Sequence, residues 1–291
     1  MQLSGVYACL PTPFDHLGDI YVSKVPCNIN RLSDTSLAGF VVSGREGEGS
    51  LLADHERVRL WETVKAATDR TVLPAVEAAG VRATVDLIGQ AAAMGFEAAL
   101  VGLSAALPSE LTNHDTRALY VQSVVDRSSL PLVVSLEDSK SEDRLPPQQL
   151  GSLAQHARVI GVRIVSSDAA YLRDCVEACR GRAGVFIGSA DLLAQGLIDG
   201  ASGAMTGFAS AAPYLCLSIE EAVRTREFAA AEDLQSVAKP AIEAIRRHGV
   251  AGLKYAADLQ GYYGGAPRLP LSPLGPQGKA DIESAFRDIK S

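Results

Sequence analysis

Short apolar runs alternate, along the first 225 or so residues, with longer segments whose apolar positions recur at helical spacing. Each run is continuously apolar, which is typical of a parallel strand buried on both faces. The eight predicted strands are Gly5–Leu10, Gly39–Ser43, Val72–Val76, Ala98–Leu103, Leu132–Leu136, Val159–Ile164, Val185–Ile187 and Gly203–Thr206. The helices predicted to connect them are Asp54–Thr68, Val81–Met94, Asn113–Asp126, Pro146–His156, Ser167–Cys179, Asp191–Ile198 and Ser210–Arg224.

Repeated strand–helix units require right-handed crossovers and a parallel sheet. We therefore predict an α/β fold, a (β/α)₈ TIM barrel, over residues 1–225. The alternative is an open doubly wound sheet. That fold needs a glycine-rich phosphate turn after the first strand, and the segment Leu10–Phe14 is not one. Because proline clashes inside a helix, Pro26 predicts that the helix of the first crossover is short or distorted.

After Arg224 the pattern becomes purely helical. Helices are predicted over Phe228–His248, Leu253–Leu259 and Lys279–Ile289, and a run rich in proline and glycine, Tyr262–Gln277, precedes the last of them. We predict that residues 226–291 form an all-helical C-terminal extension that belongs to the same structural unit as the barrel.

Composition narrows the classes of partner. The net charge of −7 over 291 residues argues against nucleic acid, which needs a basic surface. The five cysteines are odd in number and lack disulfide spacing, which predicts reduced thiols and a cytoplasmic protein. The sequence has no signal peptide pattern and no uncharged apolar run of about 18 residues. No metal-ligand spacing or dinucleotide fingerprint occurs, so we expect neither a metal nor a cofactor.

Four groups of short motifs run along the chain. They are Ala8–Phe14 with Gly18–Ile20, Ser43–Glu48 with Glu56 and Arg57, Ile187–Asp191 with Gly200–Gly203, and Lys254–Ala257 with Gly261 and Arg268–Leu271. Their order and spacing resemble the dihydrodipicolinate synthase / N-acetylneuraminate lyase family. The resemblance implies a barrel with a helical extension and a homo-oligomer, either a dimer or a dimer-of-dimers tetramer. It also implies a strand-six lysine that binds a 2-oxo acid as an imine and a strand-five tyrosine that moves the proton.

The positions that carry this chemistry differ here. Arg163 stands at the place of the lysine, and Ser135 at the place of the tyrosine. A guanidinium stays protonated and cannot form the imine. Loss of a positioned general acid–base typically costs about 10²–10⁴-fold in rate. Arg45 and Glu46 replace two threonines of the family motif. We predict that Schiff-base chemistry is lost on a preserved scaffold.

The remodelled face is predicted to bind a small anionic ligand, a 2-oxo acid or a sugar acid. In the family, the glycine turn after strand two cradles the carboxylate, and the position of Lys140 often carries a carboxylate-binding arginine. The alternative role of the glycines is a tight turn that needs positive φ. The predicted ligand-binding residues are Gly44, Arg45, Glu46, Gly47, Lys140 and Thr206.

Other interpretations stay open. Arg163 would fill the old cavity if it paired with Glu46 or Glu137 and left no space for a ligand, because a buried charge needs a partner. A conventional class I lyase would need another lysine, of which Lys140 is the best placed. A third possibility is a non-catalytic partner of an active paralogue.

Overall fold

The computed structural model describes residues 1–78, 80–102, 113–137 and 144–289. Eight parallel strands form a closed barrel in which neighbours in sequence pair and β8 pairs with β1. Their bounds are β1 Gly5–Cys9, β2 Gly39–Val42, β3 Thr71–Val76, β4 Ala99–Gly102, β5 Leu132–Glu137, β6 Val159–Val165, β7 Gly184–Ile187 and β8 Gly203–Thr206. Each strand begins and ends within one residue of its predicted bounds, so the barrel prediction is confirmed.

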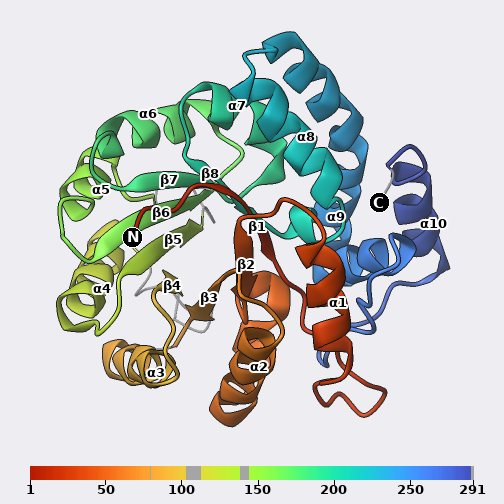
Figure 1. Cartoon of the computed structure of the whole chain (residues 1–291), viewed down its shortest axis with the longest axis horizontal. Helices are drawn as coiled ribbons and strands as arrows, with labels where there is room; N and C mark the ends of the chain where they lie inside the picture. Colours follow the sequence, from red (N-terminus) through yellow and green to blue (C-terminus); the bar gives the residue numbers. More distant parts are fainter. Residues whose placement is uncertain (79, 103–112, 138–143, 290–291) are drawn as a thin grey trace.

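Helices follow the strands and surround the barrel (Figure 1). They are α1 Lys24–Ser33, α2 Asp54–Ala66, α3 Val81–Ala93, α4 His114–Arg127, α5 Pro147–Leu153, α6 Ala169–Cys179, α7 Leu193–Ile198 and α8 Pro213–Arg224. The expectation for the first helix was wrong, since α1 is an ordinary ten-residue helix. Pro26 lies in its first turn, where the backbone N–H groups have no acceptor within the helix.

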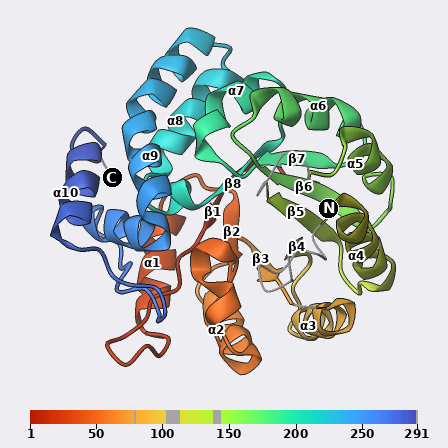
Figure 2. The same cartoon turned by 180° about the vertical axis from the view of Figure 1, so that it is seen from behind.

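Two further helices, α9 Phe228–Leu259 and α10 Pro276–Ala285, complete the chain. They lie together on one side of the barrel, beside α8 and α1, as the two opposite views show (Figures 1 and 2). The two helices predicted over residues 228–259 are joined, with a break at Gly249, whose φ is 60° and ψ −145°. The division of the chain at residue 225 stays a prediction.

Side chains on the strands alternate between the barrel interior and the surrounding helices. The interior apolar cluster includes Tyr7 and Cys9 of β1, Leu73 and Ala75 of β3, and Val133 of β5. The same alternation continues to the carboxyl ends of the strands. It therefore directs the last inward-facing residues to the barrel mouth, where catalytic and binding residues of this fold lie.

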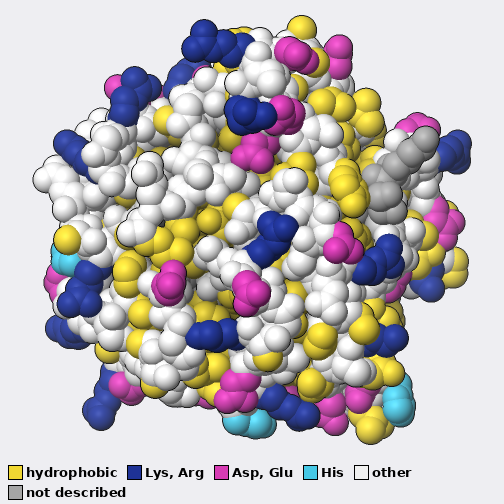
Figure 3. All heavy atoms as spheres, viewed as in Figure 1, with side chains coloured by type: hydrophobic (Ala, Val, Ile, Leu, Met, Phe, Trp, Pro, Cys, Tyr) yellow, Lys and Arg dark blue, Asp and Glu magenta, His cyan; other side chains and the backbone are white. Residues whose placement is uncertain are grey.

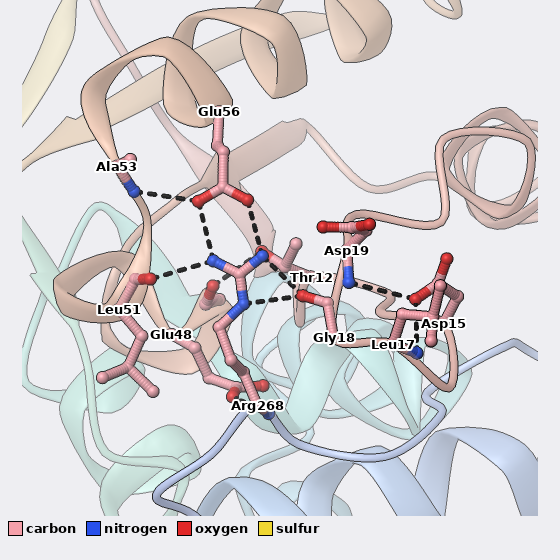
Figure 4. A network of polar contacts seen from close by, with 11 residues as sticks. Thr12, Asp15, Leu17, Gly18, Asp19, Glu48, Leu51, Ala53, Glu56 and Arg268 are labelled. Carbon is pink, nitrogen blue, oxygen red and sulfur yellow. Dashed lines mark hydrogen bonds and ion pairs between the residues drawn. The ribbon is translucent and has the colours of Figure 1, made fainter.

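A network of polar contacts fastens the C-terminal segment to the start of the barrel (Figure 4). The guanidinium of Arg268 makes a bidentate pair with Glu56 of α2, with N–O distances of 2.6 and 2.7 Å. It also donates to the backbone oxygens of Gly18 and Leu51. Hydrogen bonding to Arg268 lowers the pKa of Glu56 below its usual value. We call Glu48, Glu56, Lys254 and Arg268 the clamp.

The second half of the clamp is a fully buried ion pair. Lys254 Nζ lies 2.5 Å from Glu48 Oε1, and both side chains are inaccessible to solvent. Glu48 Oε2 accepts from the backbone N–H of Arg268, while Lys254 also donates to the backbone oxygen of Ala266 and lies over the ring of Phe14. All four clamp residues belong to motifs that carried the family resemblance. Their contacts assign those motifs to holding chain segments together.

The surface shown in Figure 3 mixes charged side chains of both signs with apolar and neutral ones. This face carries no extended basic patch. No helix among the described residues is both long and apolar enough to cross a bilayer.

Candidate active site at the barrel mouth

Arg163 of β6 is the centre of the candidate site. Its side chain is 2% exposed. Its Nε donates to the backbone oxygen of Met205 at 2.8 Å, and its Nη1 donates to Ser135 Oγ at 3.3 Å. Ser135 is the register partner of Arg163 on β5, so the two positions that depart from the family motifs are neighbours in the sheet.

Glu46 binds the other side of the arginine. Arg163 Nη2 donates to Glu46 Oε1, which closes an ion pair across the barrel mouth. Burial by itself lowers the pKa of Arg163, but the charges of Glu46 and Glu137 outweigh it and raise the pKa above its usual value. Arg163 is therefore a permanent cation here. The pair between Arg163 and Glu46 is one of those that the cavity-filling interpretation names.

One carboxylate oxygen of the Arg163–Glu46 pair makes no hydrogen bond. Glu46 Oε2 is buried and has no hydrogen-bond partner. A buried carboxylate oxygen without a donor carries the full cost of its desolvation. The site therefore has a place for a hydrogen-bond donor that the described protein residues do not supply.

In the glycine turn between β2 and α2, the residues with positive φ are not the glycines that were expected to have it. Gly44 has φ −78°, and Gly47 also lies outside the left-handed region. Ser43 and Glu48 adopt it instead, with φ of 58° and 56°. Gly47 is needed for close packing, since a Cβ there would lie 2.9 Å from the backbone oxygen of Leu10. The positive-φ reason was thus wrong, and close approach of the backbone replaces it.

The remaining predicted ligand residues are spread over the mouth. Arg45 pairs with Glu137, and the Arg45 side chain is 65% exposed. Thr206 is buried at the end of β8, where its Oγ1 accepts from the backbone N–H of Phe208 at 3.4 Å. Lys140 lies outside the described residues. Arg45, Glu46 and Thr206 thus line one opening, whereas Gly44 and Gly47 do not belong to its lining.

That open space is a cleft of about 310 Å³ between the carboxyl ends of the strands and α9. Its polar lining includes Arg45, Glu46, Glu137 and Asp191, and Thr206 and Gly207 form part of its wall. The apolar wall comes from Val165, Phe208, Ile242, Ile245, Val250 and Leu253. The break of α9 at Gly249 lies in the same lining. An open cleft beside the ion pair favours ligand binding over a filled cavity.

Sequence reasoning missed Glu77, the residue directly after β3. Burial, followed by the charges of Glu137 and Glu46, raises the pKa of its carboxyl group to about 7. The alternation that points Leu73 and Ala75 inward also predicts an inward Glu77, so the signal was present in the sequence. Burial likewise raises the pKa of the nearby Cys9 thiol, which stays protonated.

None of the described lysines lines the cleft. Lys254, which belongs to the clamp, is enclosed by Glu48, Phe14 and the backbone of Ala266. Burial lowers its pKa, and Glu48 opposes that shift. Within the described ranges no group of three or more His, Cys, Asp or Glu side chains is arranged to hold a metal ion.

Comparison with known proteins places the whole chain in one family. The model of the "Dihydrodipicolinate synthetase family" matches residues 2–289. An L-threo-3-deoxy-hexylosonate aldolase of Hypocrea jecorina is 29% identical over 98% of this chain and 95% of its own. A 4-hydroxy-tetrahydrodipicolinate synthase of an Exiguobacterium species is 26% identical over 99% and 98%, respectively.

Solved structures show the same fold. A dihydrodipicolinate synthase of Bacillus anthracis superposes with a TM-score of 0.91 over the full length of both chains, at 20% identity. An N-acetylneuraminate lyase of Proteus mirabilis gives a TM-score of 0.85 over 99% of this chain and 98% of its own, at 23% identity. With its barrel mouth, its clamp and a family match over nearly every residue, this chain belongs to the dihydrodipicolinate synthetase family.

Proposed function

We propose that this protein binds a small carboxylate, a 2-oxo acid or a sugar acid, at the barrel mouth without forming an imine. The observation that carries the proposal is Arg163, a buried and permanently charged side chain at the place where the family resemblance puts the imine-forming lysine. A guanidinium recognises a carboxylate by charge and paired hydrogen bonds, and it is no nucleophile at neutral pH.

Three features of the site support this proposal. The cleft gives a ligand space beside the Arg163–Glu46 pair. Arg45 adds an exposed cation at its edge. Glu46 Oε2 offers an unused acceptor to a hydroxyl of a hydroxylated acid. The proposed ligand-binding set remains Gly44, Arg45, Glu46, Gly47, Lys140 and Thr206, with Arg163 and Ser135 at the former catalytic positions.

The further parts of the proposal concern the molecule in solution. We propose a cytoplasmic homo-oligomer, a dimer or a dimer-of-dimers tetramer, in which the 1–225 barrel and the 226–291 extension act as one unit. The support is the assembly that the family resemblance implies, together with the clamp that joins the extension to the barrel.

A second candidate is an active class I aldolase that uses another lysine, with Lys140 as the residue concerned. The names of the relatives favour it, because they include an aldolase and a synthase at 29% and 26% identity. A lysine nucleophile must reach the ligand with a lowered pKa. A non-catalytic role beside an active paralogue is the third candidate.

Borohydride trapping separates these candidates. The protein is incubated with a pool of 2-oxo acids, reduced, and analysed by intact mass and peptide mapping, with an active homologue as positive control. We expect no covalent adduct and a rise in thermal stability with the acid that binds. An adduct mapped to a lysine would contradict the proposal and identify the nucleophile.

Restoring the family pair tests the alignment of the site. The double variant Arg163→Lys and Ser135→Tyr should form a trappable imine with pyruvate, because it returns an amine and a proton carrier to adjacent register positions. The single variant Ser135→Tyr is the matched control and should form none. A double variant without an adduct would count against either the register or an open pocket.

A further inference from the structure

The long helix α9 forms one wall of the cleft at the barrel mouth. Its lining residues recur at the spacing of a single helical face up to the break at Gly249. They are Ile242, Ile245, Arg246, Gly249, Val250 and Leu253. This face of α9 therefore supplies much of the surface that a ligand in the cleft would meet.

Three apolar side chains of the cleft lining are only half-buried. They are Val165, at the end of β6, and Ile245 and Val250 of α9, whereas the lining residues Phe208 and Leu253 are buried. Half-buried apolar surface inside a concave site contacts water that a ligand can displace, and this displacement favours an apolar group. We call Val165, Ile245 and Val250 the open wall.

Arg246 is the cation of the lining that is best able to bind an anion. Its ion-pair distance to Glu243 is 4.0 Å, and Glu243 also pairs with Arg247 at 3.7 Å. Within the described part of the chain the Arg246 guanidinium makes no hydrogen bond. Arg45, the other arginine of the lining, already forms a close pair with Glu137. Arg246 therefore has donors to spare for a carboxylate.

The carboxylates of the lining determine where the negative group of a ligand can lie. Glu46 and Glu137 are neutralised by ion pairs with arginines. Asp191, after β7, accepts from Ser189 Oγ at 2.9 Å and forms no ion pair with the other described residues. Its unbalanced charge repels an anion, so a bound carboxylate is expected at α9 rather than at the β7 end of the cleft.

We propose that the cleft selects acids that carry an apolar substituent: Arg246 binds the carboxylate, and the open wall binds the substituent. The inference rests on the proposed function and narrows its ligand to a 2-oxo acid of this kind, in place of a polyhydroxylated sugar acid. Glu46 Oε2 can take one hydroxyl, but the open wall has no side-chain acceptor for the others, which would lose their hydrogen bonds to water. The cleft of about 310 Å³ lies at the lower end of the range of small-molecule sites, which suits one such acid.

The test titrates the whole protein with a series of acids at pH 7 by calorimetry. Pyruvate, 2-oxobutanoate, 2-oxopentanoate and 2-oxohexanoate differ only in their number of CH₂ groups, and D-gluconate matches 2-oxohexanoate in carbon number and charge. Affinity should rise about two- to fourfold with each CH₂ group, because the burial of each one is favourable. 2-Oxohexanoate should bind at least about tenfold more tightly than D-gluconate.

Val250→Thr tests the open wall, because it keeps the shape of the side chain and replaces a methyl group by a hydroxyl. It should weaken the binding of 2-oxohexanoate by about threefold and leave that of pyruvate unchanged, since pyruvate is too short to reach the wall. Val237→Thr is the matched control. Val237 is an exposed valine of the same helix and does not belong to the cleft lining, so neither affinity should change.

Arg246→Gln tests the carboxylate contact. It should weaken pyruvate and 2-oxohexanoate alike by about tenfold, because both acids carry the carboxylate. Arg247→Gln is the matched control, since Arg247 is the next residue of α9, also pairs with Glu243 and lies outside the cleft lining. That variant should keep the affinities of the wild type.

Constant affinity along the series, or tighter binding of D-gluconate than of 2-oxohexanoate, would overturn the selection of apolar acids and leave the proposed function standing. Equal weakening of both 2-oxo acids by Val250→Thr would overturn the role of the open wall. Equal losses in Arg246→Gln and Arg247→Gln would overturn the role of Arg246. Failure of every acid to bind would overturn the proposed function and this inference together.

Discussion

Two arginines of this chain, Arg268 and Arg163, both form ion pairs with glutamates, but their guanidinium groups differ in how many hydrogen bonds they make. Arg268 makes five hydrogen bonds, to Glu56 and to the backbone oxygens of Gly18 and Leu51. Arg163 makes three, and its partner Glu46 keeps a buried oxygen without a donor. A saturated guanidinium fixes chain segments, as in the clamp. An incomplete network beside a cleft leaves bonds for a ligand to make.

The largest effect is expected in the clamp. Lys254→Met would leave Glu48 as an uncompensated buried charge, so the free energy of unfolding should fall by about 3–5 kcal/mol. Urea denaturation followed by circular dichroism measures it. The control is Arg180→Ala, which removes a pair with Glu177 whose side chains are both 67% exposed. In that variant the free energy of unfolding should fall by less than about 1 kcal/mol. Equal costs would mean that the clamp does not stabilise the fold as described.

The next effect concerns the pH dependence of stability at the mouth. The folded protein holds the Glu77 proton to about pH 7, whereas the carboxyl group of the unfolded chain loses it near its ordinary value of 4.5. The folded state therefore binds more protons in this window, and the free energy of unfolding falls as pH rises through it. Glu77→Gln removes this contribution and should be more stable than the wild type at pH 8, by up to about 3 kcal/mol.

Denaturation at pH 5, 6, 7 and 8 measures this difference. The control variant Glu62→Gln carries its substitution at an exposed position of α2. Its free energy of unfolding should fall with rising pH as that of the wild type does. A difference between Glu77→Gln and the wild type that does not grow with pH would show that Glu77 is ionised throughout.

Matched amide variants compare the two regions directly. Glu46→Gln keeps an acceptor for Arg163, whose charge the nearby Glu137 still offsets, so it should lower the free energy of unfolding by about 1 kcal/mol. Glu48→Gln removes the only charge that pairs with Lys254 among the described residues and should cost about 2 kcal/mol. Thermal unfolding of both variants shows which of the two substitutions lowers stability more. A larger cost at Glu46 would assign a structural role to the mouth as well.

The smallest effect on stability is expected for Arg45, at the exposed edge of the barrel mouth. Arg45→Ala breaks an ion pair with Glu137 in which the arginine is 65% exposed, so stability should change by less than about 1 kcal/mol. The proposed ligand contact predicts a separate result, a several-fold loss of pyruvate affinity at pH 6. Unchanged affinity would remove Arg45 from the ligand-binding set.

The candidate site was predicted in part. Arg163 and Ser135 were identified by their places in motifs, and the ion pair with Glu46 was among the alternatives. Glu77 was missed because no motif contains it, and its raised pKa depends on burial and on the charges of Glu137 and Glu46, which other elements bring near it. The reason given for the glycine turn failed because Ser43 and Glu48, rather than Gly44 and Gly47, adopt positive φ.

The sequence by itself determined the eight strands, their order and the family, because buried parallel strands and short motifs are local patterns that periodicity and spacing reveal. Tertiary structure alone decided which charges meet. Glu46 and Arg163 are 117 residues apart, and Glu48 lies 220 residues from Arg268. Whether a buried charge is saturated, as at Arg268, or left with a vacant partner, as at Glu46, depends on the closure of the barrel and the packing of α9. No local pattern in the chain records that geometry.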